Sequence, residues 1–270
     1  MRPSSDKRRL VVLDIDGTLL TSSGAILRST RQATAALIDR GHMVALASAR
    51  PPKSVKTIAD SLLGSDAAAL ISLNGALIMH GGAVLYERTI GARAIHAIVE
   101  AAIARRLEVN LFTASEWFVE SIGEGVLAEA EILGFGPTIV ADFRAAPAAH
   151  KVLLIGSSDT IAGLRDWANQ SRLGVSAALS KATYCEITSV QTSKAAAIGV
   201  LAREYGVDIS DVIAFGDGDN DLPMMASAGI GVAMGNGTPA LKHAANLVTS
   251  SNDTDGISRA LGRLGLIDPL

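Results

Sequence analysis

The feature that most constrains the fold is an apolar run that ends in two carboxylates, RLVVLDIDGTL at residues 9–19. A run of this kind is typical of a buried parallel strand that delivers a functional site at its carboxyl end. Asp14 and Asp16 are two positions apart, and carboxylates held this close repel each other unless a cation or a shared proton offsets them. The stretch therefore indicates a metal site, although an ordinary acidic turn after a strand has the same local pattern.

Composition supports an α/β fold. Of the 270 residues, 49% are hydrophobic but only 4% are aromatic, so the core must consist of Ala, Val, Leu and Ile. Open parallel sheets covered by helices usually have such cores. The length allows one large α/β domain or two smaller ones.

The first part of the chain alternates between strand and helix patterns. Strand-like runs at residues 10–14, 43–47 and 69–73 alternate with helical patterns at residues 29–40 and 55–63. Short connections between such elements are typical of a parallel sheet with right-handed crossovers. This part of the chain therefore predicts one side of a doubly wound, Rossmann-like sheet.

The rhythm changes in the middle of the chain. Paired strand patterns and interspersed helices, one of them at residues 92–106, occupy the region 84–185, and we assign no element to its Gly- and Glu-rich stretch. The α/β alternation returns from residue 193 onward. We therefore predict a discontinuous core domain of residues 1–83 and 186–270, with an inserted α+β domain at 84–185.

Polar residues at the ends of the predicted core strands define a candidate site, because the carboxyl ends of parallel strands share one edge of a sheet. They are Asp14, Asp16, Ser48, Arg50, Lys194 and the loop of residues 216–221. Several carboxylates around one point suit Mg²⁺, which keeps some waters and takes a phosphate oxygen. A lysine and a hydroxyl opposite the metal would hold the remaining phosphate oxygens, so the set predicts phosphoryl transfer.

The two carboxylates of the first strand suit different roles. Asp14 leaves the strand first and is the candidate nucleophile, since a carboxylate can accept a phosphoryl group covalently. Asp16 is the candidate general acid and base for the leaving alcohol and the attacking water. Gly17 and Thr18 would shape the turn that lets backbone amides approach the anion.

At these residues the chain resembles the haloacid dehalogenase superfamily. Residues 14–18 (DIDGT) resemble its first motif, and Ser48, Lys194 and Gly216-Asp217 fall where its other three motifs are expected. Further matches resemble its Cof-type branch, phosphatases with a type IIB cap: ISLNGA at 71–76, EI at 186–187, GDGDND at 216–221, GVAMGN at 231–236 and NDTDG at 252–256. The resemblance covers nearly the whole chain. It implies that the core domain, residues 1–83 and 186–270, is catalytic and that the inserted domain at 84–185 is a cap that selects the substrate.

The resemblance implies Mg²⁺-dependent hydrolysis of a small phosphate ester, such as a sugar phosphate or related metabolite, through an aspartyl-phosphate intermediate. The metal residues it implies are Asp14, Asp16 through its main-chain carbonyl, Asp217, and Asp221 in support. The phosphate or substrate residues it implies are Ser48, Arg50, Asn74, Lys194 and Asn220.

Several positions depart from the family pattern, among them Ala49 and Ala195, which stand where glycine is usual. No reacting group is lost, so these changes affect the expected substrate preference more than the expected activity. Within the enzyme class a phosphomutase or a glycosyl-phosphate-specific phosphatase stays open. A function outside the enzyme class also stays open, namely that of a non-catalytic phosphometabolite-binding protein, although such a protein has no need of both Asp14 and Asp16.

Charge and cysteine content limit the partners. The formal net charge of −3 offers no general attraction to nucleic acid or an anionic membrane. The polar residues 1–9 do not resemble a signal peptide, no apolar run is long enough to span a bilayer, and the single Cys185 excludes an intrachain disulfide. We expect a cytoplasmic protein that binds a small phosphorylated metabolite; the sequence predicts no oligomeric state.

Overall fold

The structure is a computed structural model that describes residues 7–64, 66–143 and 148–268. Residues 1–6 of the polar amino-terminal segment, which we expect not to be a signal peptide, lie outside the described residues. Within the described ranges, none of the helices combines the length and apolar character that crossing a bilayer requires.

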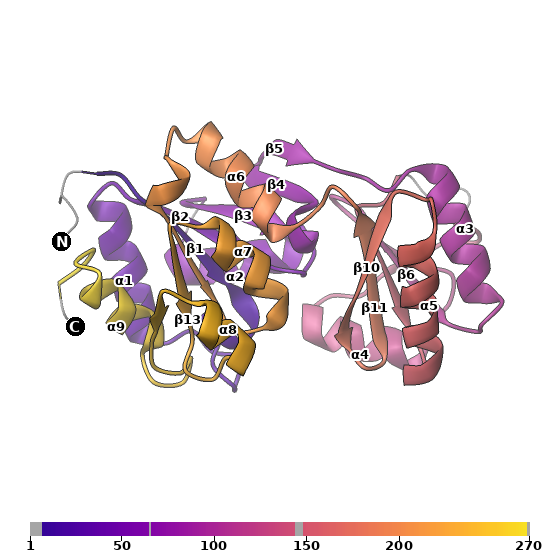
Figure 1. Ribbon diagram of the computed structural model, residues 1–270. Coiled ribbons are helices and arrows are strands. Elements are labelled where there is room, and N and C mark those ends of the chain that lie inside the picture. The colour runs from indigo at the N-terminus through magenta and orange to yellow at the C-terminus, as the bar shows by residue number, and fades with distance from the viewer. Residues whose placement is uncertain (1–6, 65, 144–147, 269–270) are drawn as a thin grey trace. The chain divides into compact units, whose positions relative to one another are not determined.

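The chain divides into two compact units (Figure 1). Unit 1 comprises Met1–Ala49, Val55–Tyr86 and Ser193–Leu270, and unit 2 comprises Arg50–Ser54 and Glu87–Thr192. The predicted domain boundary at residue 185 falls inside a strand, Tyr184–Ser189, that pairs with two strands of unit 2. The second unit therefore extends past this strand, because a strand hydrogen-bonded on both sides cannot be divided between two domains.

Unit 1 contains an eight-stranded sheet in the order β14-β13-β12-β1-β2-β3-β4-β5. Its strands are β1 (Leu10–Asp14), β2 (Met43–Ala47), β3 (Ala68–Ser72), β4 (Leu77–His80), β5 (Ala83–Glu87), β12 (Val212–Gly216), β13 (Ile230–Ala233) and β14 (Leu247–Val248). The pairs from β14 through β3 are parallel, and β4 pairs antiparallel with β3. Strand β1 therefore lies in the middle, between β12 and β2.

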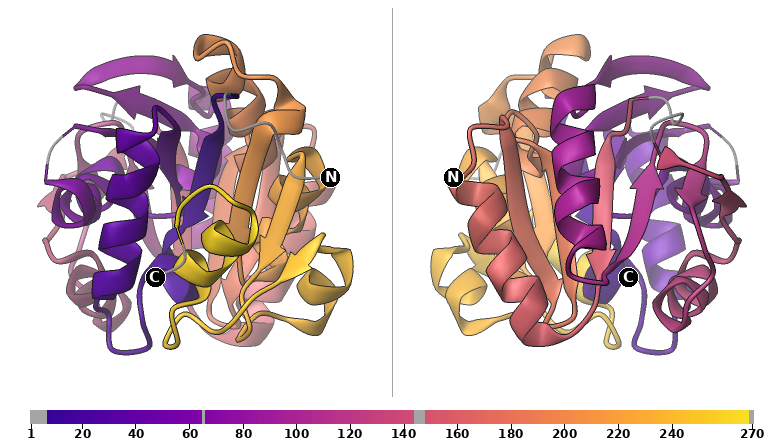
Figure 2. Two further views of the ribbon diagram at one scale, coloured as in Figure 1. Left: turned by 90° about the vertical axis from the view of Figure 1, so that its left-hand side faces the viewer. Right: turned by 90° about the vertical axis from the view of Figure 1, so that its right-hand side faces the viewer.

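Helices pack on both faces of this sheet. They are α1 (Arg28–Asp39), α2 (Pro52–Leu63), α6 (Lys194–Glu204), α7 (Leu222–Ser227), α8 (Pro239–Ala244) and α9 (Gly256–Arg263). Alternate residues of β1 point to opposite faces: Val11 and Leu13 join one apolar cluster with α1, α2 and α9, whereas Leu10 and Val12 join another with α6. Figure 2 (left) shows α1 beside α9 from the other end of the chain. This arrangement confirms the predicted doubly wound α/β core.

Unit 2 contains a six-stranded, mostly antiparallel sheet in the order β10-β11-β9-β6-β7-β8. Its strands are β6 (Glu108–Phe112), β7 (Trp117–Val119), β8 (Thr138–Ile139), β9 (Lys151–Ile155), β10 (Val175–Lys181) and β11 (Tyr184–Ser189). Helices α3 (Ala92–Ile103) and α5 (Ser158–Gln170) lie on one face of this sheet (Figure 2, right). Both contribute side chains to the same apolar cluster. Unit 2 thus has the α+β composition that the sequence predicts.

Two helical expectations for unit 2 differ from the structure. The helix predicted at residues 92–106 ends at Ile103, because Arg106 adopts a left-handed backbone with φ of 55°. The Gly- and Glu-rich stretch contains a helix, α4 (Glu124–Leu133). The Glu108 carboxylate accepts hydrogen bonds from the amides of Gly125 and Val126, so a strand distant in sequence caps this helix.

Candidate active site

The site lies at the carboxyl edge of the unit 1 sheet, where β1 and β12 end side by side. Asp14 is the last residue of β1, and the register pairs Leu13 with Phe215 of β12. Asp217 follows the end of β12 directly. Parallel pairing in this register therefore brings two carboxylates about 200 positions apart to the same point.

Lys194 completes the buried cluster from a third segment. It is the first residue of α6, whose start is capped by the Ser193 hydroxyl, which accepts a hydrogen bond from the Ala196 amide. Its Nζ donates to Asp14 Oδ1 at 2.5 Å and to Asp221 Oδ1 at 2.7 Å. Only 4% of Lys194 is exposed, so both ion pairs are shielded from water.

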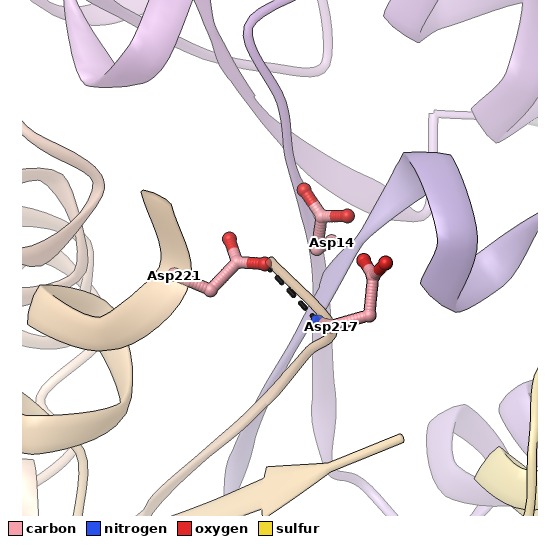
Figure 3. Close-up of side chains that lie close together, drawn as sticks. All are labelled: Asp14, Asp217 and Asp221. Atoms are coloured by element: carbon pink, nitrogen blue, oxygen red, sulfur yellow. Dashed lines mark hydrogen bonds between the residues drawn. The ribbon is translucent and has the colours of Figure 1, made fainter. Parts of the chain in front are cut away.

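The Asp221 carboxylate is held on both of its oxygens. Oδ1 accepts from Lys194, and Oδ2 accepts from the amides of Asp217 and Gly218 at 3.2 Å each. Figure 3 shows the hydrogen bond from the backbone amide of Asp217 to Asp221, together with the carboxylates of Asp14, Asp217 and Asp221. Asp221 therefore holds both the Asp217 loop and the lysine in place.

The turn after β1 fits closely against Asp217. Gly17 has φ of 77°, and a Cβ built on it would lie 2.3 Å from Asp217 Oδ2. The Thr18 hydroxyl donates to Asp217 Oδ1 at 3.2 Å. Glycine is thus required both for the left-handed backbone and for the space that the Asp217 carboxylate occupies.

The electrostatics of the cluster call for additional positive charge. Burial, together with Asp221 and Asp217, raises the pKa of Asp14 well above its ordinary value although Lys194 opposes the shift. Burial and the Asp221 charge raise the pKa of Asp217 to about 6. Burial alone would lower the pKa of Lys194, but the carboxylates of Asp14 and Asp221 outweigh it and raise that pKa. One ammonium therefore does not balance the surrounding carboxylates.

These residues fit a divalent cation. Asp14, Asp217 and Asp221 each offer a carboxylate oxygen, and these oxygens lie within 4.8 Å of one another. An all-oxygen donor set with excess negative charge suits a hard cation such as Mg²⁺.

Ser48 and Asn74 occupy the neighbouring strand ends. Ser48 follows β2 and is buried, its amide donating to the Ile71 carbonyl, while the Asn74 amide donates to the Ser48 carbonyl at 3.0 Å. Leu73 and Asn74 both have positive φ, at 53° and 61°. The chain therefore adopts an uncommon backbone conformation next to the predicted site, where strain is often functional.

The remaining predicted residues lie outside the buried cluster. Asp16 is exposed in the turn after β1, and Asn220 is exposed on the loop that carries Asp217. Arg50 belongs to unit 2, where its guanidinium donates to the Ile132 carbonyl at 2.8 Å and to the Ser54 hydroxyl at 3.2 Å. A substrate contact of Arg50 thus stays a prediction.

Sequence reasoning assigned no site contact to Asn236. Its side-chain amide donates to the Gly17 carbonyl at 2.8 Å. No local pattern signals this bond, because its partners are 219 positions apart and exposed asparagines in loops are common. The resemblance at residues 231–236 was the one available indication.

Comparisons with known proteins agree with this geometry. The family model described as haloacid dehalogenase-like hydrolase matches residues 11–261. YkrA of Bacillus subtilis (strain 168) is 30% identical over 266 residues, which cover 96% of this chain and 98% of YkrA. The chain therefore belongs to the haloacid dehalogenase-like hydrolases.

Solved structures support the same assignment. A haloacid dehalogenase-like hydrolase from Bacteroides thetaiotaomicron matches with a TM-score of 0.88 and 28% identity, over 96% of this chain and 100% of that chain. BT1666 of the same organism, a phosphatase of the superfamily, matches with a TM-score of 0.85 and 27% identity, over 99% and 98%. The protein is a phosphatase of this superfamily, and the predicted resemblance to its Cof-type branch is confirmed.

Proposed function

We propose that this phosphatase hydrolyses small phosphate monoesters with Mg²⁺ as cofactor and through a phosphoryl group carried on Asp14. The observation that carries the proposal is the buried cluster in which Lys194 Nζ lies 2.5 Å from Asp14 and 2.7 Å from Asp221, with Asp217 alongside. Charge neutralisation and in-line positioning are the main requirements of phosphoryl transfer.

In the first half of the reaction a carboxylate oxygen of Asp14 attacks phosphorus, and the bond from phosphorus to the ester oxygen breaks. Asp16 gives its proton to the departing alkoxide, a role that its exposure supports. In the second half Asp16 takes a proton from water, whose oxygen attacks the phosphorus of the acyl phosphate. The bond between this phosphorus and the Asp14 oxygen then breaks, which regenerates the Asp14 carboxylate and releases inorganic phosphate.

Lys194 would offset the charge of Asp14 and of the incoming phosphoryl oxygens, since its ammonium already contacts the nucleophile. Asp14, Asp217 and the main-chain carbonyl of Asp16 would hold Mg²⁺, with Asp221 in support. The bound cation would supply positive charge that favours ionised carboxylates and phosphoryl oxygens. Ser48 and Asn220 would contact the phosphoryl group, and Arg50 and Asn74 the substrate.

The proposed substrate class is a phosphorylated sugar, a sugar alcohol or a related metabolite. The B. subtilis relative YitU is named 5-amino-6-(5-phospho-D-ribitylamino)uracil phosphatase and is 27% identical over 263 residues. Its name specifies a phosphate on a polyhydroxylated chain, which supports substrates of this class. Unit 2 would act as the cap that selects the leaving group, because most of the site residues of unit 1 would contact the metal or the phosphoryl group.

The test is release of phosphate from an aryl phosphate with and without Mg²⁺, followed by a screen of phosphorylated sugars. Asp14→Asn should abolish turnover while the variant still folds, and Asp39→Asn, which changes an exposed carboxylate at the end of α1, should retain it. Metal-independent turnover, or turnover retained by Asp14→Asn, would contradict the proposal. Return of the phosphate to a product instead of solvent would indicate a mutase.

A further inference from the structure

We infer that Asn236 and Asn252 form a clamp that positions the turn after β1 against the loop that carries Asp217. This inference rests on the proposed function for its catalytic consequence, but the clamp itself is a structural statement about unit 1. Both asparagines lie in segments that resemble family motifs yet have no role in the chemistry above. They are positioning residues, because each acts through the backbone of the turn.

The clamp consists of three hydrogen bonds. Asn236 Nδ2 donates to the Gly17 carbonyl at 2.8 Å, and Asn252 Nδ2 donates to the Leu20 carbonyl at 2.8 Å. The backbone amide of Asn252 donates to Asn236 Oδ1 at 3.0 Å, so the two asparagines are also joined to each other. Asn252 is 9% exposed, and loss of its side chain would leave the bonded groups poorly solvated.

The turn that the clamp contacts has an irregular backbone. Residues Ile15–Leu19 include two with non-helical backbone angles, Asp16 and Gly17, and the amide of Leu20 donates to the Ile15 carbonyl. A trans peptide is planar, so holding a carbonyl oxygen also fixes the direction of the next amide. The clamp thereby orients the peptide planes at both Gly17 and Leu20.

The segment that carries Asn236 also contacts the Asp217 loop. The Met234 amide donates to the Gly216 carbonyl at 3.0 Å, and the Thr238 amide donates to the Asp217 carbonyl at 2.9 Å. The same segment therefore touches both parts of the site, the turn through a side chain and the Asp217 loop through its backbone. An outward movement of the turn would separate Thr18 from Asp217, which are joined at 3.2 Å.

The close fit makes small movements costly. The turn approaches the Asp217 carboxylate so closely that a single added methyl at Gly17 would lie 2.3 Å from it. A displacement of about 1 Å in a catalytic arrangement can reduce the rate by about 10²-fold. The clamp therefore affects turnover more strongly than it affects the stability of the fold.

The test compares Asn252→Ala and Asn252→Asp with Asn246→Ala. Asn246 Oδ1 accepts from the Gly231 amide at 2.7 Å near the amino-terminal end of β13, so its removal also deletes a loop hydrogen bond but leaves the turn untouched. Asn252→Asp keeps the size of the side chain but removes its hydrogen-bond donor and adds a negative charge. Asn252→Ala removes the donor without adding charge. Equal effects of the two variants would therefore be due to loss of the donor.

We expect both Asn252 variants to lower kcat by about tenfold or more, with KM changed by less than about twofold. We also expect faster hydrogen exchange in the amides of residues 17–20, measured by mass spectrometry, whereas Asn246→Ala changes neither readout. Asn236→Asp should give the same pattern, and the double variant should be no worse than the more damaged single variant, because one clamp is being broken.

Wild-type exchange at residues 17–20 in both Asn252 variants would overturn the inference. Equal effects in Asn246→Ala would overturn it too, because they would indicate general destabilisation. The exchange measurement needs no substrate, so it decides the clamp even if the wild-type protein fails to hydrolyse phosphate esters. In that event the proposed function fails, while the hydrogen-exchange result still supports or overturns the clamp.

Discussion

Replacement of Gly17 by alanine tests the geometry of the site most directly. Gly17 has φ of 77°, a conformation that costs a residue with a Cβ roughly 1–2 kcal/mol. The added methyl would also lie 2.3 Å from Asp217 Oδ2, whereas ordinary contacts are 3.4 Å or longer, so the carboxylate must move by about 1 Å. This movement removes the Thr18 hydrogen bond, worth about 0.5–1.5 kcal/mol.

The total expected loss in the free energy of unfolding is therefore about 1.5–3.5 kcal/mol. Gly24→Ala is a matched control, because Gly24 has φ of 78° but nothing within 4 Å of the position of its added Cβ. The control should lose about 1–2 kcal/mol from the backbone alone. Urea denaturation of the two variants and the wild type measures both values.

Activity should separate the variants much more than stability does. Gly17→Ala should lower Mg²⁺ affinity, measured by calorimetry, and reduce turnover by about 10²-fold, because Asp217 is displaced. Gly24→Ala should keep both properties within about twofold. If Gly17→Ala bound Mg²⁺ and turned over substrate like the wild type, Asp217 would not be the ligand that the turn encloses.

Three other measurements test further parts of the structure. Gly75→Ala should lower both the melting temperature, measured by circular dichroism, and the turnover. The added Cβ would lie 2.4 Å from the Ser193 carbonyl oxygen, next to Lys194. A wild-type melting temperature and turnover would contradict this packing. Cys185 is fully buried and burial raises its pKa to about 12, so its thiol should resist Ellman's reagent at pH 8 until urea unfolds the protein. Its pKa is higher when folded, so its contribution to stability should be complete below about pH 9 and lost as pH rises toward 12; rapid native labelling would show that it is accessible. Chelation of Mg²⁺ should lower the melting temperature, because the bound ion stabilises the folded state. Removal of Mg²⁺ present at 100 times its Kd should lower the free energy of unfolding by about 2.7 kcal/mol. Asp217→Ala should abolish this effect.

The sequence alone was sufficient for the core sheet and for most of the cluster. Strand β1 is apolar throughout and ends in Asp14, so its burial and its place at a sheet edge follow from residue type and order. Once parallel order is assumed, Asp217 must reach the same edge, because the carboxyl ends of parallel strands coincide.

Other features depended on contacts between distant segments. The pairing of Lys194 with Asp221 as well as Asp14, and the clamp of Asn236 and Asn252, join loops whose side-chain directions no periodicity encodes. Helix α4 was missed for the same reason, since its first turn is satisfied by the Glu108 carboxylate from a strand.

Local sequence thus determined which residues leave each strand and toward which edge of the sheet they lead, because strand burial and side-chain alternation depend on near neighbours. Only the tertiary structure decided which carboxylate shares the lysine and which amides hold the turn after β1. Those choices depend on the packing of segments that are distant in the chain, 180 positions apart for Lys194 and Asp14 and 219 or more for the bonds that hold the turn. These hydrogen bonds form only after the sheet has brought the segments together.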